Sequence, residues 1–302
     1  MSILKTRWIW FSLFLILLAA SLGALAKWHL QPGIDFVGGT SVEYAYSEPV
    51  EQGKVLKALT AAGFQDSTVQ QTSSDTVLVR TQALSESDQQ KLLTTLSGIG
   101  QGSEQKLQSV GPTIGRDLTK KAVTGVALAI VGIMLYVAWA FRKIPKPLNS
   151  WEFGFAAVLT LGHDVLFVLG LFAALGHFYG YTVDSYFITA LLTVMGFSVH
   201  DTIVVFDRIR ENLLTHRDWS LAHIFDASVA QTAARSFNTS LTAIIVLVTL
   251  VILGGESIRP FVVALIAGIG VGTYSSIFVA TPLLPVLATR PQWLLKLRRR
   301  SK

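Results

Sequence analysis

Two histidine–aspartate pairs lie inside otherwise apolar segments, and they are the residues of this sequence best placed to do chemistry. His163 and Asp164 stand near the middle of one apolar run, and His200 and Asp201 stand in the next. An ionisable side chain at the centre of a bilayer costs about 2.5 to 3.5 kcal/mol on insertion scales, so each is a functional candidate unless it is paired. Because chains of Asp, Glu and His relay protons in pumps, the two pairs predict a path for ions.

Further polar residues share faces with these pairs. Thr160 lies one turn before His163 and Asp164, and Ser198 lies on the Asp201 side of its helix. The next apolar run carries a polar stripe at i, i+3, i+4 and i+7, formed by Arg235, Asn238, Thr239 and Thr242.

Arg235 and Asp201 are expected at similar depth in the membrane, so the sequence predicts that they form a pair. Two interpretations stay open. A static pair would lower the cost of burying both charges. A switched pair would open when Asp201 is protonated and close when it is ionised, which the two adjacent His-Asp pairs favour.

Enzyme chemistry fits these residues poorly. Adjacent His and Asp side chains on a helix point about 100° apart, and the further ligands of a hydrolytic metal site are missing. A nucleophilic triad of Ser198, His200 and Asp201 would need one short helical segment to aim three groups at one another. We therefore expect no catalytic residue, no metal and no cofactor, only protons or sodium ions as a coupling ion.

The composition indicates a membrane protein. The chain has 302 residues, of which 51% are hydrophobic and 15% charged, and its mean hydropathy is +0.51. The cysteine count is 0, so disulfides and thiolate metal sites are excluded. A span needs about 17 to 25 mostly apolar residues, and six segments qualify. They lie near residues 8–26, 122–141, 153–175, 187–206, 236–254 and 260–288.

The positions of Lys and Arg predict the orientation. Basic residues cluster before the first span, after the second, between the fourth and fifth and after the last, whereas the opposite short loops carry only Arg259. Both termini are therefore expected in the cytoplasm, with residues 27–121 outside. We interpret the basic tail, residues 290–302, as a topology determinant beside anionic lipid and expect no nucleic-acid binding.

The first span carries a competing signal. The sequence "ALA" at 24–26 resembles a signal-peptidase site, but the apolar run before it is longer than the usual signal core of about 7 to 15 residues. We expect an uncleaved span.

The predicted organisation is thus an N-terminus with the first span (1–26), an outside domain (27–121), a bundle of five spans (122–289) and the tail (290–302).

The outside segment has the pattern of a small α+β domain. Strands are predicted at 40–46, 67–72, 76–82 and 103–110, and helices at 50–63 and 85–96. The order β-α-β-β-α-β is that of the ferredoxin-like fold. The domain shows no catalytic constellation, which favours a role in binding or leverage.

Small residues mark joints and packing faces. "GIDFVGG" and "GPTIG" connect the domain to its flanking spans and serve either as tight turns or as hinges. Their candidate hinge residues are Gly33, Gly38, Gly39, Gly111, Pro112 and Gly115.

In the last span a small residue recurs every four positions, which lets a helix of this or another chain approach closely. This face consists of Ala264, Gly268, Gly272, Ser276 and Ala280.

Several of these stretches together resemble a known family. "GIDFVGGTSVE", "GPTIGRDL", "LGHDVLFVLGLFAALG", "VMGFSVHDTIVVFDRIREN", "RSFNTSLTAI" and "GVGTYSSIFVAT" occur in the order and spacing of the SecF subunits of bacterial SecDF protein-export complexes, from residue 33 to about 282. His200 stands where that family commonly has Asn.

The resemblance implies a polytopic α-helical membrane protein related to the RND exporters, with six spans and one periplasmic domain. It implies a place in the bacterial cytoplasmic (inner) membrane, with residues 27–121 in the periplasm. It also implies SecD, the SecYEG channel and a translocating preprotein as partners, and a proton-driven or sodium-driven pull on that preprotein. Asp201 and Arg235 match the family's ion-coupling residues, and His163 and Asp164 match a motif of its third span. Two alternatives stay open: an RND-type exporter of small molecules or lipids, and a structural scaffold of the translocon.

Overall fold

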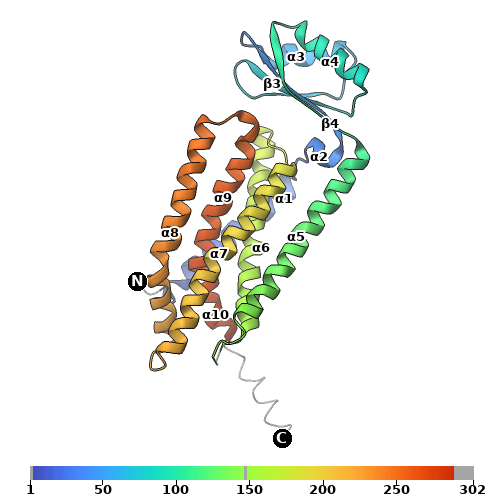
Figure 1. Ribbon diagram of the computed structural model, residues 1–302. Helices are drawn as coiled ribbons and strands as arrows, with labels where there is room; N and C mark the ends of the chain where they lie inside the picture. The colour runs from blue at the N-terminus through green and yellow to red at the C-terminus, as the bar shows by residue number, and fades with distance from the viewer. Residues whose placement is uncertain (1–2, 146–147, 289–302) are drawn as a thin grey trace.

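The computed structural model describes residues 3–145 and 148–288 of the chain, and it has two parts (Figure 1). A bundle of long helices forms one part, and a small α+β domain lies beyond one end of it. The connection between α7 and α8 lies at the opposite end of the bundle.

Six helices of the described residues are long and apolar enough to cross a membrane, as the sequence predicts. They extend beyond the predicted apolar cores because their polar end turns continue the helix. The first five are α1 (Arg7–Trp28), α5 (Pro112–Ala140), α6 (Ser150–Tyr179), α7 (Ser185–Thr215) and α8 (Leu221–Leu253).

The sixth span is interrupted. It consists of α9 (Arg259–Ser275), a π-helical turn η2 (Ser276–Ala280) and α10 (Thr281–Ala288), and a 3-10 turn η1 (Glu256–Ile258) precedes it. Single π turns inside α-helices are frequent at functional sites. The apolar pattern predicts this span but not its π turn.

The domain has the predicted ferredoxin-like order. Its sheet is antiparallel with strand order β2-β3-β1-β4, where β1 is Gly39–Tyr46, β2 Thr68–Gln71, β3 Thr76–Thr81 and β4 Gly102–Val110. Helices α3 (Gln52–Ala61) and α4 (Glu86–Ser97) supply the buried residues Leu59, Leu92 and Leu96 to the domain core. Alternation along β1 directs Val42 and Tyr44 into that core and leaves Ser41 and Glu43 on the other face of the sheet.

The two glycine-containing connections pack against each other. A short helix α2 (Ile34–Val37), which the sequence does not predict, ends at Gly38 and lies against the start of α5. A Cβ on Gly38 would lie 2.9 Å from the Cα of Pro112, and a Cβ on Gly115 would lie 2.8 Å from the carbonyl oxygen of Phe36. Gly38 and Gly39 also have φ values of +81° and +146°, which disfavour other residues. Gly111 has open space around it.

The small-residue face of the last span packs inside this chain. A Cβ on Gly268 would lie 2.3 Å from Val194 of α7, and one on Gly272 would lie 2.9 Å from Ser198. Ala264 and Ala280 are fully buried. The neighbour that the sequence left open is thus α7, and the close approach brings hydroxyl groups of α9 to the carboxylates of α6 and α7.

Candidate functional site

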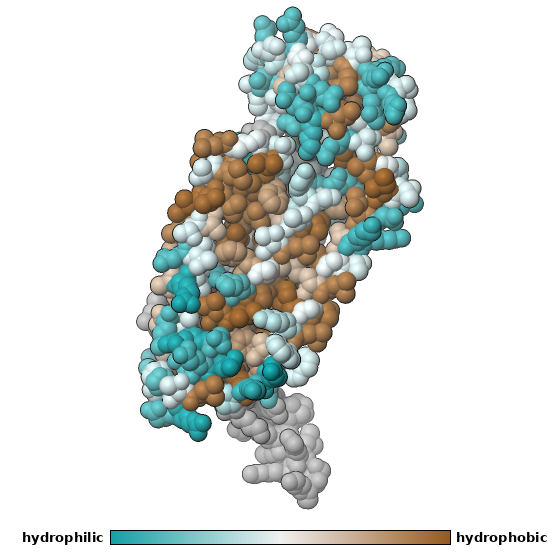
Figure 2. Space-filling view, viewed as in Figure 1, coloured by the Kyte–Doolittle hydropathy of each residue, from teal (hydrophilic) through white to brown (hydrophobic). Residues whose placement is uncertain are grey.

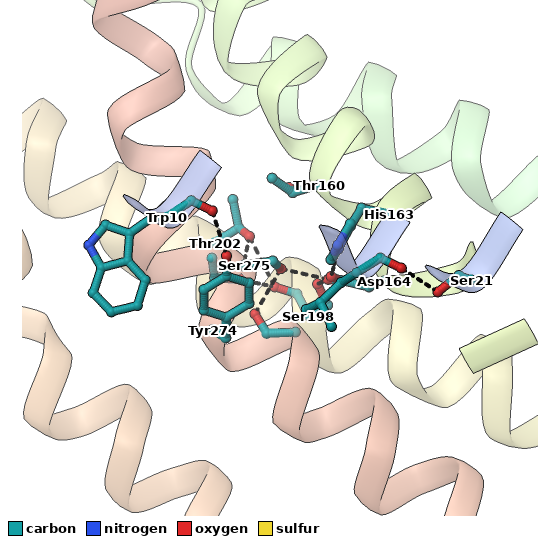
Figure 3. Close-up of polar contacts among 12 residues, drawn as sticks. Trp10, Ser21, Thr160, His163, Asp164, Ser198, Thr202, Tyr274 and Ser275 are labelled. Atoms are coloured by element: carbon teal, nitrogen blue, oxygen red, sulfur yellow. Dashed lines mark hydrogen bonds and ion pairs between the residues drawn. The ribbon is translucent and has the colours of Figure 1, made fainter. Parts of the chain in front are cut away.

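The Asp164 carboxylate is fully buried and receives three donors from its surroundings (Figure 3). Its Oδ2 accepts hydrogen bonds from the hydroxyls of Ser198 on α7 and Ser275 on α9, each at 2.7 Å. Its Oδ1 lies 3.1 Å from Nδ1 of His163. Distances of about 2.5 to 2.7 Å are typical of hydroxyl donors to an ionised carboxylate. The pocket therefore suits Asp164 as a fixed negative charge.

His163 uses only one of its ring nitrogens. The ring is buried and stacks on Phe14 of α1, with ring centroids 4.1 Å apart. Nδ1 faces Asp164, whereas Nε2 is buried without a hydrogen-bond partner among the described residues. A buried polar atom without a partner is costly, so Nε2 is a place where a proton or a water molecule would be stabilised.

The Asp201 carboxylate has a looser pocket between α7, α8 and α9. Its Oδ2 lies 3.3 Å from the Ser240 hydroxyl and 3.4 Å from the Thr273 hydroxyl. Both hydroxyls have closer acceptors than Asp201, because they lie 2.5 Å from each other and because the carbonyls of Ser236 and Ile269 lie 3.0 Å and 2.8 Å away. A hydroxyl carries one hydrogen, so donation to a carbonyl or to the other hydroxyl leaves lone pairs to face Asp201. This arrangement accommodates a protonated Asp201 that donates to Ser240 or Thr273.

Two further buried hydroxyl groups lie beside the Asp164 pocket. The Ser198 carbonyl accepts from the hydroxyls of Thr202 at 3.1 Å and Ser276 at 3.0 Å, and these two hydroxyls lie 2.8 Å apart. Ser276 begins the π turn and follows Ser275, which contacts Asp164. The last span thus touches both carboxylates within one helical turn, through Thr273 and Ser275.

The prediction that Asp201 contacts Arg235 is wrong within this chain. Ser236 and Ser240, not Arg235, are the residues of α8 that face Asp201 and are buried. The whole stripe lies on the exposed side of α8, and among the described residues no ion pair of Arg235 is found. The stripe residues are Arg235, Asn238, Thr239 and Thr242.

Two other predicted residues lie outside the pockets. His200 is exposed on α7, on the side away from the buried Asp201, because consecutive helical residues point about 100° apart. Thr160 is buried but donates only to backbone carbonyls of Ala156 and Ala157. Ser198, by contrast, belongs to the Asp164 pocket rather than to the Asp201 side.

Sequence reasoning missed most of the hydroxyl groups that line the pockets. These are Thr202, Ser236, Ser240, Thr273 and Ser275. A usable signal was present, because Ser236 and Ser240 are spaced i, i+4 in an apolar span and all four residues at positions 273 to 276 carry a hydroxyl. Among the residues that the structure describes, no cluster of three or more His, Asp or Glu side chains could hold a metal ion.

Comparison with known proteins places this geometry in a family. Residues 90–290 match the family described as "Protein export membrane protein SecD/SecF, C-terminal", and residues 26–50 match the "SecD/SecF GG Motif". The chain is 42% identical over 295 residues to a protein translocase subunit SecF from Thermobaculum terrenum, covering 93% of this chain and 92% of the relative. It is 38% identical over 292 residues to one from Vibrio alginolyticus, covering 94% and 88%.

Solved structures agree with the fold. The crystal structure of SecDF from Thermus thermophilus, described as a translocon-associated membrane protein, superposes with a TM-score of 0.85 at 32% identity. The match covers 96% of this chain and 39% of that one, so the chain spans about two fifths of the solved SecDF chain. A SecDF structure in a super-membrane-facing form gives a TM-score of 0.68 at 31% identity.

Proposed function

The chain belongs to the SecF family of protein translocase subunits, and on that basis we propose that it couples ion entry at Asp201 to late steps of protein export across the bacterial cytoplasmic membrane. The proposal assigns no bond-making or bond-breaking chemistry to the chain. Moving one charge through 100 mV releases about 2.3 kcal/mol. That free energy is comparable to the few kcal/mol that bias a two-state equilibrium.

The contrast between the two carboxylate pockets carries this proposal. Asp164 is held by two hydroxyl donors at 2.7 Å, whereas Asp201 has none closer than 3.3 Å. Protonation of Asp164 would remove two strong hydrogen bonds, but protonation of Asp201 would add a donor where lone pairs already face it. Asp201 is therefore the carboxylate that takes up and releases a proton. Asp164 holds a compensating charge, and His163 accepts a proton or water at Nε2.

A sodium ion is the alternative coupling ion for the same pocket. Oxygen atoms of Asp201, Ser236, Ser240 and Thr273 come from three helices, and hard cations prefer oxygen ligands. The Ser236 hydroxyl has no hydrogen-bond partner among the described residues and would be free to turn toward an ion. We favour the proton because the hydroxyls lie far from Asp201 and close to backbone carbonyls.

We propose the exposed faces of α7 and α8 as the side that meets SecD. His200 of α7 and Arg235 and Asn238 of the α8 stripe leave polar groups uncovered at membrane depth, where lipid cannot satisfy them. Figure 2 shows teal and white side chains among brown ones across this side of the bundle. The solved SecDF chain is more than twice as long as the matched part, which leaves room there for a second half. Arg235 would then pair with an acidic residue of that half.

The membrane orientation follows the same proposal. The backbone N–H groups of Ile3 and Leu4 donate to Asp226 at the start of α8, so the N-terminal end lies beside the α7–α8 connection. Basic residues gather at that end of the bundle, which makes it cytoplasmic under the positive-inside rule. The domain at the other end would be periplasmic, where it meets the preprotein leaving SecYEG.

Export into inverted membrane vesicles tests the coupling. We expect Asp201→Asn to abolish the part of export that a protonophore abolishes in the wild type, with membrane insertion and SecD association retained. Asp207→Asn, an exposed acidic residue on the same helix, is the matched control and should export normally. Sensitivity to a sodium ionophore instead of a protonophore would identify sodium as the ion. Full gradient-dependent export by Asp201→Asn would overturn the proposal and favour a scaffold.

A further inference from the structure

The outer end of α7 is tied to the segment that leads into the domain. Val183 forms a parallel bridge with Pro32, in which the Gly33 N–H donates to the Val183 carbonyl at 2.7 Å and the Val183 N–H donates to Gln31 at 2.8 Å. Asp35 adds a side-chain contact, because its Oδ2 accepts the backbone N–H of Ser185 at 2.9 Å. We name residues 31–35 and 183–185 the outer joint.

Asp35 satisfies a particular need of α7. The first N–H groups of a helix have no partner within the helix, and Ser185 is the first residue of α7. Asp184 caps the Phe187 N–H at 2.8 Å, so the Ser185 N–H depends on Asp35 from another part of the chain. Burial raises the pKa of Asp184, with Asp35 adding to the shift and Lys106 opposing it. The two carboxylates therefore cap different N–H groups of the same helix end.

The joint leads directly to the centre of the domain. Asp35 lies in α2, which ends at Gly38, and β1 begins at Gly39. β1 is an inner strand that pairs with β3 on one side and β4 on the other. A displacement of the α7 outer end therefore reaches the sheet through a few residues of ordered backbone.

The rest of the domain rests lightly on the bundle. A cavity of about 260 Å³ separates the uncovered face of the sheet from the outer ends of the helices. Side-chain contacts across it include Gln70 Nε2 donating to the Tyr179 carbonyl at 2.8 Å and Arg80 donating to the Thr182 hydroxyl at 3.5 Å. Such contacts break and re-form more easily than the backbone bridge, in which Gly33 and Val183 are buried. The outer joint is thus the firm connection to α7, in addition to the direct passage from β4 into α5.

We propose that Asp35 is a positioning residue that holds the outer end of α7 to the central strand of the domain, so that a shift of α7 moves the domain. The inference rests on the proposed function, because it is the protonation of Asp201 on α7 that would cause the shift. Asp35 touches neither the ion nor the preprotein. It acts through Ser185 and the helix that carries Asp201.

Distance measurement between two spin labels tests the link. The chain has no cysteine, so Gln90→Cys on α4 and Gly255→Cys beyond α8, both exposed, are unique labelling sites in the full chain. We expect Asp201→Asn, which mimics the protonated state, to shift the distance distribution when Asp35 is intact. Asp35→Ala should remove that difference, Asp35→Asn should keep it because an acceptor oxygen remains, and Glu43→Ala on the cavity wall should leave it unchanged.

The outcomes separate the two proposals. If Asp201→Asn changes nothing with Asp35 intact, the coupling itself fails and the inference falls with it. If the shift appears and survives Asp35→Ala, the coupling stands and the role of Asp35 is overturned. In export assays Asp35→Ala should lose about tenfold of the gradient-dependent rate, and Asp35→Asn less than about threefold.

A crosslink tests whether the joint stays closed. A Cβ on Gly33 would lie 3.2 Å from the Cβ of Asp184, a few tenths of an ångström below the usual separation in a disulfide. The oxidised double variant Gly33→Cys, Asp184→Cys should therefore export at a rate close to that of its reduced form. Loss of export on oxidation, restored by reductant, would show that the joint opens during the cycle and would overturn a fixed link.

Discussion

The two buried carboxylates differ because of where the hydroxyl hydrogens go. Ser198 has no nearer acceptor than Asp164, and Ser275 has its closest acceptor there as well, at 2.7 Å against 3.1 Å to the Gly272 carbonyl. Ser240 and Thr273 have closer carbonyl acceptors than Asp201. One fully buried Asp is therefore held as a charge, while the other is left able to change its protonation.

Removing one hydroxyl from each pocket should separate these roles. Ser275→Ala takes a charge-assisted hydrogen bond from Asp164, which typically costs about 1.5 to 3 kcal/mol. Ser240→Ala removes a long contact to Asp201 together with neutral hydrogen bonds to the Thr273 hydroxyl and the Ser236 carbonyl, and should cost less, about 0.5 to 1.5 kcal/mol. We expect thermal unfolding in detergent to show a clear fall in Tm for Ser275→Ala and a small one for Ser240→Ala. Equal losses for both variants would contradict the assignment of Asp164 as the fixed charge.

The same contrast shows what the sequence can and cannot predict about a site. His163, Asp164 and Asp201 stand out because charge inside an apolar run is rare. Arg235 stands out for the same reason, but the packing of neighbouring helices decides which face of α8 is buried. In this chain the buried face carries Ser236 and Ser240, and Arg235 lies on the exposed face. Serine and threonine fit an apolar span by bonding to their own backbone, so their role in a pocket leaves only a weak sequence signal.

At the scale of elements, helix boundaries follow a similar rule. Hydropathy predicts each apolar core, whereas α5 and α8 begin well before their predicted spans because Pro112 and Ser220 start a helix in polar sequence. The ferredoxin-like order follows from alternation and turn residues, and the structure confirms it. The π turn at Ser276 and the short helix α2 depend on tertiary contacts, which no local pattern encodes.

The contact between α7 and α9 fixes the Asp201 pocket, and a single methyl group should disturb it. A Cβ at Gly268 would lie 2.3 Å from Cγ2 of Val194, so Gly268→Ala must push the two helices apart. Overpacking of this kind typically costs about 1 to 3 kcal/mol. Gly270→Ala on the same helix is the matched control, because nothing lies within 4 Å of the added Cβ.

Both glycine variants should be compared by Tm in detergent and by gradient-dependent export. We expect Gly268→Ala to lower both and Gly270→Ala to leave both unchanged or slightly raise the Tm, since alanine favours helix. If Gly268→Ala exported normally at an unchanged Tm, the close packing of α7 on α9 would not be required to form the pocket.

At the scale of the whole molecule, the bundle has a well-covered inside and an incompletely covered outside. In α6 and α7, 50% of the most apolar window is buried, whereas in α8 the figure is 11%. Low burial alone is typical of a lipid-facing helix, but α8 also exposes Arg235 and Asn238. A guanidinium in lipid is costly, which argues that a second membrane protein completes this face.

The α8 stripe therefore predicts a dependence on assembly. Arg235→Ala should weaken co-purification with SecD and reduce gradient-dependent export, because an acidic partner would lose its counter-charge. Removing one member of a desolvated charge pair typically costs about 2 to 5 kcal/mol of binding free energy.

The control is Lys120→Ala, which removes a positive charge from an exposed position on α5, away from this face. It should have no effect on either measurement. The stability of the isolated chain should be unchanged by Arg235→Ala, since no ion pair within the described residues involves that side chain. Normal assembly and export by Arg235→Ala would show that the stripe faces lipid or water instead.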